Sequence, residues 1–184
     1  MKTLFINQIN AASAGEFSRA FGAVYEHSPW IAERAFALKP IGGFASRAAL
    51  HAALVATVQS ASETQKLALL NAHPELAGKE SAAGSLTAES TAEQASAGLT
   101  AMSAADVSQL RELNAQYRQK FGFPFIIAVR NNTQSAIFGA IKSRLTNSPA
   151  MEMNNALMQV GEIARLRLLD LVGDEQPSPP QPSP

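Results

Sequence analysis

The chain has 184 residues and a mass of 19.5 kDa, the size of one domain or of one domain with a tail. Fifteen basic residues balance fifteen acidic ones, which argues against a nucleic-acid-binding protein that relies on bulk positive charge. The absence of cysteine excludes disulfides, cysteine-ligated metals and thiol catalysis, and no apolar run is long enough to predict a membrane span. The first ten residues lack the apolar core of a signal peptide and the three histidines are scattered. We therefore expect a soluble cytoplasmic protein without a metal site.

Helical patterns begin near residue 13 and follow one another along the chain. Ser13 and Glu16 have the spacing of a capping box, in which each side chain bonds the other residue's backbone N–H. Ser28 and Pro29 predict an N-cap followed by proline in the first turn, where its missing N–H costs nothing. Apolar residues at helical spacing then predict a helix within residues 45–59.

The later helices are expected after similar start signals. These signals are a capping box at Ser62 and Gln65, a cap at Thr87 or Ser90, a cap at Ser103, a helix over residues 133–145, and Pro149 at the start of the last helix. Residues 78–86 read as a glycine-bearing loop.

One segment does not have a helical pattern. Residues 123–129 form a continuous apolar run, and no second β-rich run exists with which it could pair. The sequence therefore predicts an all-α, single-domain helical bundle with one extended apolar segment near residues 123–130. We place this domain at residues 1–173 and expect residues 174–184, which are rich in proline and serine, to be a disordered tail.

A few polar residues stand where they could carry chemistry. His73 precedes Pro74, which disfavours the helical conformation at residue 73 and so places the imidazole at a helix end. A histidine held in this way suits general acid–base catalysis, although a His-Pro pair is more often a simple turn. Glu89 and Glu93 lie one helical turn apart, either as a solvated acidic face or with one of them beside His73.

Two arginines are further candidates. The apolar stripe of the last helix includes Leu157, Val160 and Ala164, and the next position on it places Arg167 at the edge of the buried face. A guanidinium there needs a partner, which is either a protein carboxylate such as Glu162 or an anionic ligand. Arg130 has the same ambiguity and is expected to be more exposed.

Three motifs together resemble a known family. They are His73-Pro-Glu-Leu-Ala-Gly78, Leu86-Thr-Ala-Glu-Ser-Thr-Ala-Glu-Gln-Ala-Ser-Ala-Gly98, and Phe121-Gly-Phe-Pro-Phe-Ile-Ile-Ala-Val-Arg130, supported by Ser28-Pro-Trp30 and Glu162-Ile-Ala-Arg-Leu-Arg-Leu168. In order and spacing they are similar to the decarboxylases of 2-oxo-4-hydroxy-4-carboxy-5-ureidoimidazoline (OHCU), which act in urate degradation. The resemblance extends over about residues 3–170.

This resemblance implies an all-α homodimer that converts OHCU to (S)-allantoin and CO2 without a metal or an organic cofactor. It implies His73 as the catalytic histidine and Glu93 as its acidic partner. The substrate-binding positions that it implies are Pro74, Ser90, Gln94, Phe125, Ile126, Ile127, Ala128, Val129 and Arg167. Glu75 stands where aspartate is common in the family, which keeps the charge.

Two other functions stay open at this stage. The first alternative is a non-catalytic partner module of another urate-pathway enzyme. The second is a decarboxylase for a related ureido acid. The sequence also leaves open whether Arg130 or Arg167 anchors the substrate carboxylate. The chain ends in Pro-Ser-Pro rather than in a peroxisomal tripeptide, which agrees with the expected cytoplasmic location.

Overall fold

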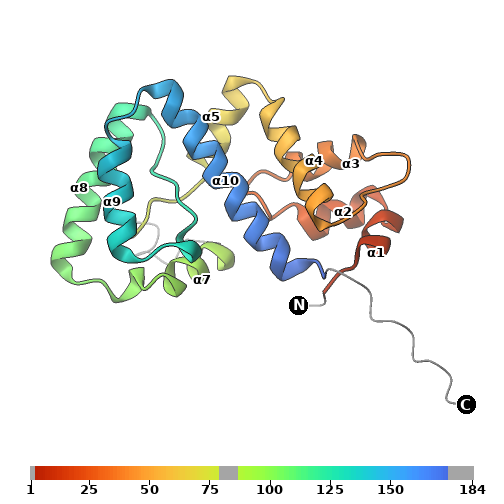
Figure 1. Cartoon of the computed structure of the whole chain (residues 1–184), viewed down its shortest axis with the longest axis horizontal. Coiled ribbons are helices and arrows are strands. Elements are labelled where there is room, and N and C mark those ends of the chain that lie inside the picture. The colour runs from red at the N-terminus through yellow and green to blue at the C-terminus, as the bar shows by residue number, and fades with distance from the viewer. Residues whose placement is uncertain (1–2, 79–86, 174–184) are drawn as a thin grey trace, which may run out of the picture. The chain divides into compact units, whose positions relative to one another are not determined.

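In the computed structural model, residues 3–78 and 87–173 are described, and they form helices joined by turns and one long extended segment (Figure 1). The elements are α1 (Ile6–Ala11), α2 (Ala14–Phe21), α3 (Trp30–Ala37), α4 (Arg47–Gln59), α5 (Glu63–Asn71), α7 (Ala88–Ser96), η1 (Leu99–Ala101), α8 (Ala104–Phe121), η2 (Val129–Asn131), α9 (Gln134–Arg144) and α10 (Pro149–Leu171). Within these residues no strand forms, and the one isolated β-bridge joins Leu4 to Val172. The all-α prediction is confirmed.

Most helices begin at the residues whose side chains cap them. Ser13 accepts from the backbone N–H of Glu16, and Ser62 accepts from that of Gln65, each within a complete capping box. Thr87 and Ser103 cap α7 and α8 in the same way. These starts confirm the sequence prediction, because a local hydrogen bond satisfies an N–H that the helix itself leaves unpaired.

Two helix starts differ from the predictions. Helix α3 begins at Trp30 with Pro29 as its N-cap, one residue later than the pattern of Ser28 and Pro29 suggests. Helix α1 was not predicted at all, because its six residues are too few to show an apolar period. The predicted loop at residues 78–86 and the predicted tail at residues 174–184 lie outside the described residues, apart from Gly78.

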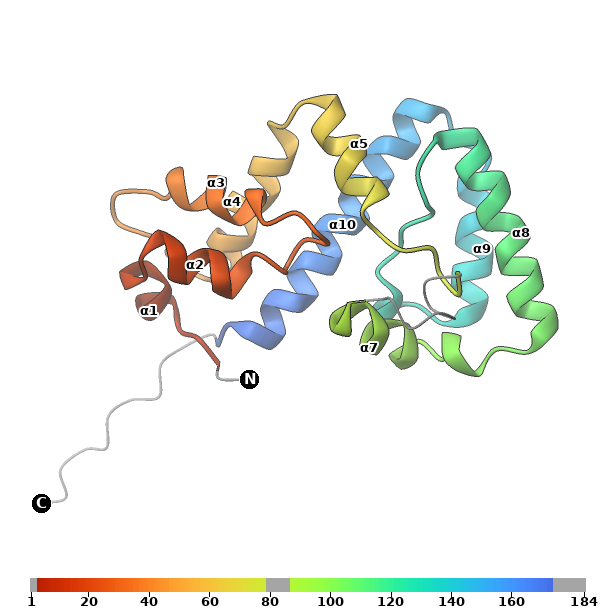
Figure 2. The ribbon, with the colours of Figure 1, turned by 180° about the vertical axis from the view of Figure 1, so that it is seen from behind.

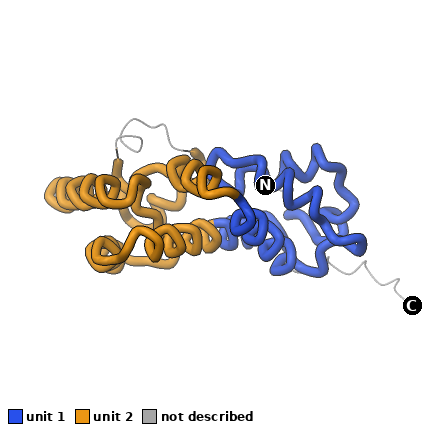
Figure 3. Tube along the Cα trace, turned by 90° about the horizontal axis from the view of Figure 1, so that it is seen from above, with its two compact units in different colours: residues 1–61, 164–184 blue, residues 62–163 orange. Residues whose placement is uncertain are grey.

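The helices gather into two compact units, which Figure 3 shows in different colours. Unit 1 comprises residues 1–61 and 164–184, and in it α2 packs against α3 and α3 against α4. Its core contains an aromatic cluster in which the ring of Phe17 lies 4.7 to 6.0 Å from the rings of Phe21, Phe36 and Phe44.

Unit 2 comprises residues 62–163 and contains most of the predicted site. In it α8 packs against α9, and α7 packs against η2. The ring of Tyr117 lies 4.6 to 6.0 Å from the rings of Phe121, Phe123 and Phe125, so the start of the apolar run is part of this core. Residues 124–128 are neither helix nor strand, as the sequence predicts.

One glycine in unit 1 is required by its backbone conformation and by its neighbour. Gly43 has φ +78°, and a Cβ there would lie 2.6 Å from both amide atoms of Asn10. The Asn10 amide donates to the Phe44 carbonyl at 2.9 Å and accepts from the Phe44 N–H at 2.8 Å. Replacement of Gly43 therefore strains the backbone and breaks these bonds together.

We expect Gly43→Ala to lower the free energy of unfolding by about 2 kcal/mol, from a left-handed alanine and weakened hydrogen bonds. Gly42→Ala is the matched control, because nothing lies within 4 Å of a Cβ at Gly42. Urea unfolding of both variants measures the difference. Equal stability of the two variants would show that neither the left-handed backbone at residue 43 nor the Asn10 hydrogen bonds contribute to the free energy of unfolding.

Candidate active site

His73 follows the C-terminal end of α5 and is buried, with 7% of its surface exposed. Its backbone N–H donates to the Leu70 carbonyl, and its Nδ1 lies 2.9 Å from the Leu69 carbonyl oxygen. A carbonyl only accepts hydrogen bonds, so Nδ1 carries the proton of this bond. The nitrogen at which a neutral His73 can take up a proton is therefore Nε2.

The loop after His73 is held by side chains of α8. Arg118 Nε forms an ion pair with Glu75 at 2.7 Å, and Asn114 Nδ2 donates to the Leu76 carbonyl at 2.9 Å. Arg111 Nε reaches the Ala77 carbonyl at 3.3 Å. The three α8 residues lie three and four positions apart and so share one helix face. This face fixes the backbone that leads away from the histidine.

Helix α7 supplies the predicted polar side chains and is bonded to the same loop. Gln94 is buried, and its Oε1 accepts from the Ala77 N–H at 3.2 Å. Ser90 is also buried, in the first turn of α7, while Glu93 is half-buried. Ser90 and Gln94 are four residues apart and so lie on one face of the helix. The structure thus joins the His73 loop to the helix that carries Ser90, Glu93 and Gln94.

The apolar run completes this part of unit 2. Phe125, Ile126, Ile127, Ala128 and Val129 are all buried. The run ends in η2, which packs against α7, and Figure 2 shows this region from behind. The structure therefore gathers three of the predicted site segments, which are the His73 loop, α7 and the C-terminal end of the run.

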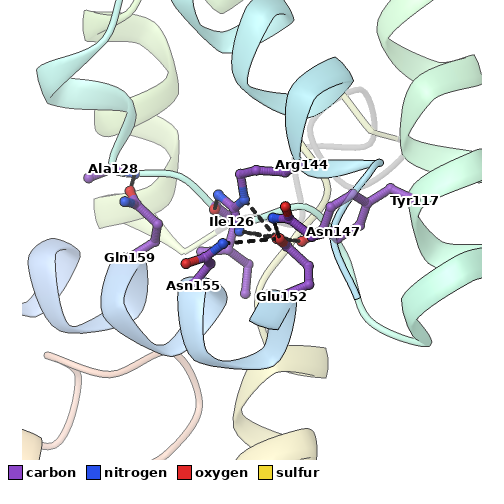
Figure 4. Close-up of polar contacts among 8 residues, drawn as sticks. All are labelled: Tyr117, Ile126, Ala128, Arg144, Asn147, Glu152, Asn155 and Gln159. Atoms are coloured by element: carbon purple, nitrogen blue, oxygen red, sulfur yellow. Dashed lines mark hydrogen bonds and ion pairs between the residues drawn. The ribbon is translucent and has the colours of Figure 1, made fainter. Parts of the chain in front are cut away.

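A buried ion pair between Arg144 and Glu152 lies beside the apolar run (Figure 4). The Glu152 carboxylate is fully buried and accepts from Arg144 Nε at 2.7 Å, Arg144 Nη2 at 2.5 Å and Asn147 Nδ2 at 2.6 Å. Tyr117 also donates its hydroxyl to this carboxylate. Burial, with the hydrogen bond to Glu152, raises the pKa of Tyr117, so this hydroxyl stays a donor.

The same contacts set the charge of Glu152. Burial alone raises its pKa, but hydrogen bonds from Arg144, Tyr117 and Asn147 and the arginine's charge outweigh burial, so the pKa lies below its ordinary value. The folded protein therefore holds this proton less tightly than the unfolded chain does. The carboxylate stabilises the fold above the unfolded pKa, and this contribution is lost as the pH falls through the folded pKa.

We expect Glu152→Gln to be less stable than the parent protein near neutral pH, and the gap between their free energies of unfolding to narrow below about pH 4.5. Urea unfolding of both proteins, from neutral pH down to about pH 3, measures this gap. A gap that stays constant over the whole range would show that Glu152 does not titrate as its contacts require.

Arg167 lies in unit 1, and its described partners are in the same unit. It is 5% exposed, and its Nη1 forms an ion pair with the buried Glu26 at 3.1 Å. The same nitrogen also lies 3.3 Å from the Val24 carbonyl. A protein carboxylate is therefore one partner of Arg167, which is one of the two alternatives that the sequence leaves open, and it belongs to Glu26 rather than to Glu162. Arg130 is exposed, as expected, and Glu162 accepts from Asn131 at 2.8 Å.

Sequence analysis missed the residues that hold the apolar run. A signal for Glu152 was present, since positions 152, 156, 160 and 164 are four residues apart and all four are buried. A charged residue on a buried stripe needs a partner. Nothing in the sequence identifies Arg144 as that partner, because the contact crosses from α9 to α10.

The described residues also bear on metals and membranes. No group of three or more histidine, aspartate or glutamate side chains among them is placed to hold a metal ion. None of the helices in the described ranges combines the length and apolarity that a bilayer span requires.

Comparisons with known proteins agree on one family. The family model described as "OHCU decarboxylase" matches residues 10–169. A 2-oxo-4-hydroxy-4-carboxy-5-ureidoimidazoline decarboxylase of Haloferax volcanii is 39% identical over 175 residues, which are 95% of this chain and all of that protein. The solved structure "Crystal structure of OHCU decarboxylase in the presence of (S)-allantoin" has a TM-score of 0.64 and 25% identity, over 86% of this chain and 97% of that chain.

A second solved structure, "Crystal structure of (S)-allantoin synthase", has a TM-score of 0.72 and 30% identity over 92% of this chain. This chain covers 54% of that one, so it corresponds to about half of the longer protein. The resemblance seen in the sequence motifs is thus confirmed over nearly the whole chain. The chain belongs to the OHCU decarboxylase family.

Proposed function

We propose that this protein is a carboxy-lyase that removes CO2 from OHCU and yields (S)-allantoin, without a metal or an organic cofactor. The observation that carries the proposal is the family match over residues 10–169, which contains every residue assigned a role below. The gathering of the His73 loop, α7 and the apolar run in unit 2 supports it.

The substrate itself supplies the electron sink for this reaction. When CO2 leaves, the electron pair of the broken C–C bond remains on a ring carbon beside C=N and C=O groups, which delocalise it. A proton must then reach that carbon on one face. The protein's task is therefore to bind one enantiomer and to move protons, without stabilising the starting carboxylate as strongly as the transition state.

His73 is the proposed general acid–base. The Leu69 carbonyl accepts from its Nδ1–H and so orients the ring, and Nε2 is the nitrogen proposed to exchange a proton with the substrate. Glu93 is the proposed acidic partner, which orients the ureido or ring N–H groups and maintains the charge state of the histidine. Its half-buried position on α7 is compatible with contact to a bound ligand.

Ser90 and Gln94 are the proposed hydrogen-bonding residues. The Gln94 Oε1 is engaged by the Ala77 N–H, which directs the amide NH2 group toward other acceptors such as a ring carbonyl. Pro74 stiffens the chain beside His73. The apolar run, Phe125 to Val129, excludes water, which strengthens each polar contact in the site.

Arg167 is carried as a substrate-binding residue from the family resemblance alone, and its ion-pair partner, the Glu26 carboxylate, lies within unit 1. The exposed Arg130 is the weaker candidate for binding the substrate carboxylate, because water screens its charge. We carry a homodimeric state from the family resemblance, and a cytoplasmic location from the sequence features given above. Light scattering of the purified protein and cell fractionation test them.

The direct test of the activity uses OHCU made in situ from urate by urate oxidase and the hydrolase that follows it. Loss of OHCU absorbance is recorded with and without this protein. Decay faster than the spontaneous rate, in proportion to protein concentration, is the expected result. Decay at the spontaneous rate with well-folded protein would refute the proposed activity and favour a binding module or a different ureido acid.

A further inference from the structure

The extended run is held at two alternate residues by side chains outside the predicted site. Arg144 Nη1 donates to the Ile126 carbonyl at 2.8 Å. Gln159 Oε1 accepts from the Ala128 N–H at 2.9 Å (Figure 4). In an extended chain, backbone groups of successive residues point to opposite edges. Fixing residues 126 and 128 therefore turns the N–H and C=O of Ile127 toward the other edge.

Ile127 has no hydrogen-bond partner for these two backbone groups among the residues that the structure describes. Buried backbone groups are almost always paired, so an unpaired donor and acceptor in a core segment indicate a ligand. Ile127 is 7% exposed and lies in the run that leads into η2 beside α7. A donor and an acceptor on one residue complement the N–H and C=O edge of a ureido or imidazoline group.

The guanidinium of Arg144, which binds the Ile126 carbonyl, is itself held in position by other residues. Glu152 accepts from two nitrogens of the guanidinium, and the Phe125 ring lies 4.7 Å from the guanidinium carbon. Only one further nitrogen, Nη1, is left for the run, and it is the one that binds Ile126. Replacing a whole buried ion pair by apolar side chains is often neutral for stability, although removing one partner alone is costly. We therefore assign to this pair the backbone geometry that it imposes on Ile126.

The Gln159 anchor lies on the same face of α10 as Glu152, since the two residues are seven positions apart. One helix thus fixes both contacts, one directly and one through Arg144. We propose that Arg144, Glu152 and Gln159 are positioning residues of the decarboxylation, which hold the run so that Ile127 presents its N–H and C=O to the substrate. This inference rests on the proposed function and adds residues to which the family resemblance gives no role.

Gln159 offers the cleanest test, because it is half-buried and lies outside the ion pair. Gln159→Met keeps the length of the side chain but removes the acceptor, whereas Gln159→Glu keeps an acceptor for the Ala128 N–H. Gln116→Met is the matched control on an exposed face of α8, where Gln116 donates to Glu112 at 3.5 Å and no other hydrogen bond of its side chain is seen within the described ranges. Amide hydrogen exchange at Ala128 reports whether the anchor is broken.

We expect Gln159→Met to lower kcat/KM at least tenfold and to speed exchange at Ala128, because small misplacements of binding groups are costly. Gln159→Glu should recover kcat/KM to within about threefold of the parent protein, and Gln116→Met should match the parent. The pH profile of kcat should keep its shape in Gln159→Met, since proton transfer by His73 is untouched. A loss of stability alone would not give this pattern.

Two outcomes would overturn the inference, and they are distinguishable. A parent protein that accelerates OHCU decay, beside a folded Gln159→Met variant of equal kcat/KM, contradicts the positioning role alone. A parent protein without activity contradicts the proposed function, and the positioning role falls with it. Arg144→Lys repeats the test at Ile126. Lysine keeps the positive charge opposite Glu152 but cannot bind Glu152 and the Ile126 carbonyl through separate guanidinium nitrogens, so we expect kcat/KM to fall as in Gln159→Met.

Discussion

Replacement of His73 by alanine is expected to lower kcat by about 10²- to 10⁴-fold, the usual contribution of general acid–base catalysis. His73 is buried at the end of α5, and the Leu69 carbonyl fixes its ring through Nδ1; alanine at this position supplies no group that exchanges a proton. The variant should still fold, because an imidazole replaced by a methyl group at a helix end leaves the capping contacts of α5 intact.

The assay must separate this loss from spontaneous decay of OHCU. The uncatalysed rate is subtracted, and circular dichroism of the allantoin formed scores the enantiomer. His27→Asn is the matched control, because His27 is exposed and has φ +46°, a conformation that asparagine tolerates. A His73→Ala rate within a few-fold of the parent would exclude His73 as the acid–base group.

Replacement of Glu26 by alanine is expected to lower the free energy of unfolding by about 3 to 5 kcal/mol. The side chains of Glu26 and Arg167 are 2% and 6% exposed, so removal of the carboxylate takes from a buried guanidinium the charge that lies 3.1 Å from it. Urea unfolding followed by circular dichroism measures the effect.

Two further variants give this result a specific meaning. Glu33→Ala, at an exposed glutamate of α3, should change stability by less than about 0.5 kcal/mol. The double variant Glu26→Ala with Arg167→Met should recover at least half of the loss, because the buried positive charge is then removed together with the Glu26 carboxylate. If Glu26→Ala is as stable as Glu33→Ala, the pair does not hold Arg167 in place.

The sequence was sufficient to predict the helices that start at a local signal. Ser13 with Glu16, Ser62 with Gln65, and Ser103 all form their caps within three residues, so no distant part of the chain is needed. The extended run was also predictable, because seven consecutive apolar residues without a β partner fit neither a surface helix nor a sheet. Helix α1 was not predictable on these grounds, since it has too few residues to show a period.

The site was predictable only as far as its residue types and motifs. His73, Glu93 and Gln94 became candidates because they stand in motifs that resemble a family, whereas Arg144 and Glu26 did not. Their importance depends on partners eight and 141 positions away along the chain. Periodicity within one helix shows that a charge is buried, but not which charge lies opposite. The positioning contacts of the run therefore emerge only from the structure.

The most direct test of the proposed activity is a time course of OHCU decay followed by circular dichroism. OHCU is generated in situ, this protein is added, and the signal of allantoin is followed until decay is complete. We expect decay to accelerate and a persistent (S)-allantoin signal to remain, because protonation on one face requires a bound substrate. Spontaneous decay to a racemic product, in the presence of well-folded protein, would contradict the proposed function and the roles of His73 and Glu93.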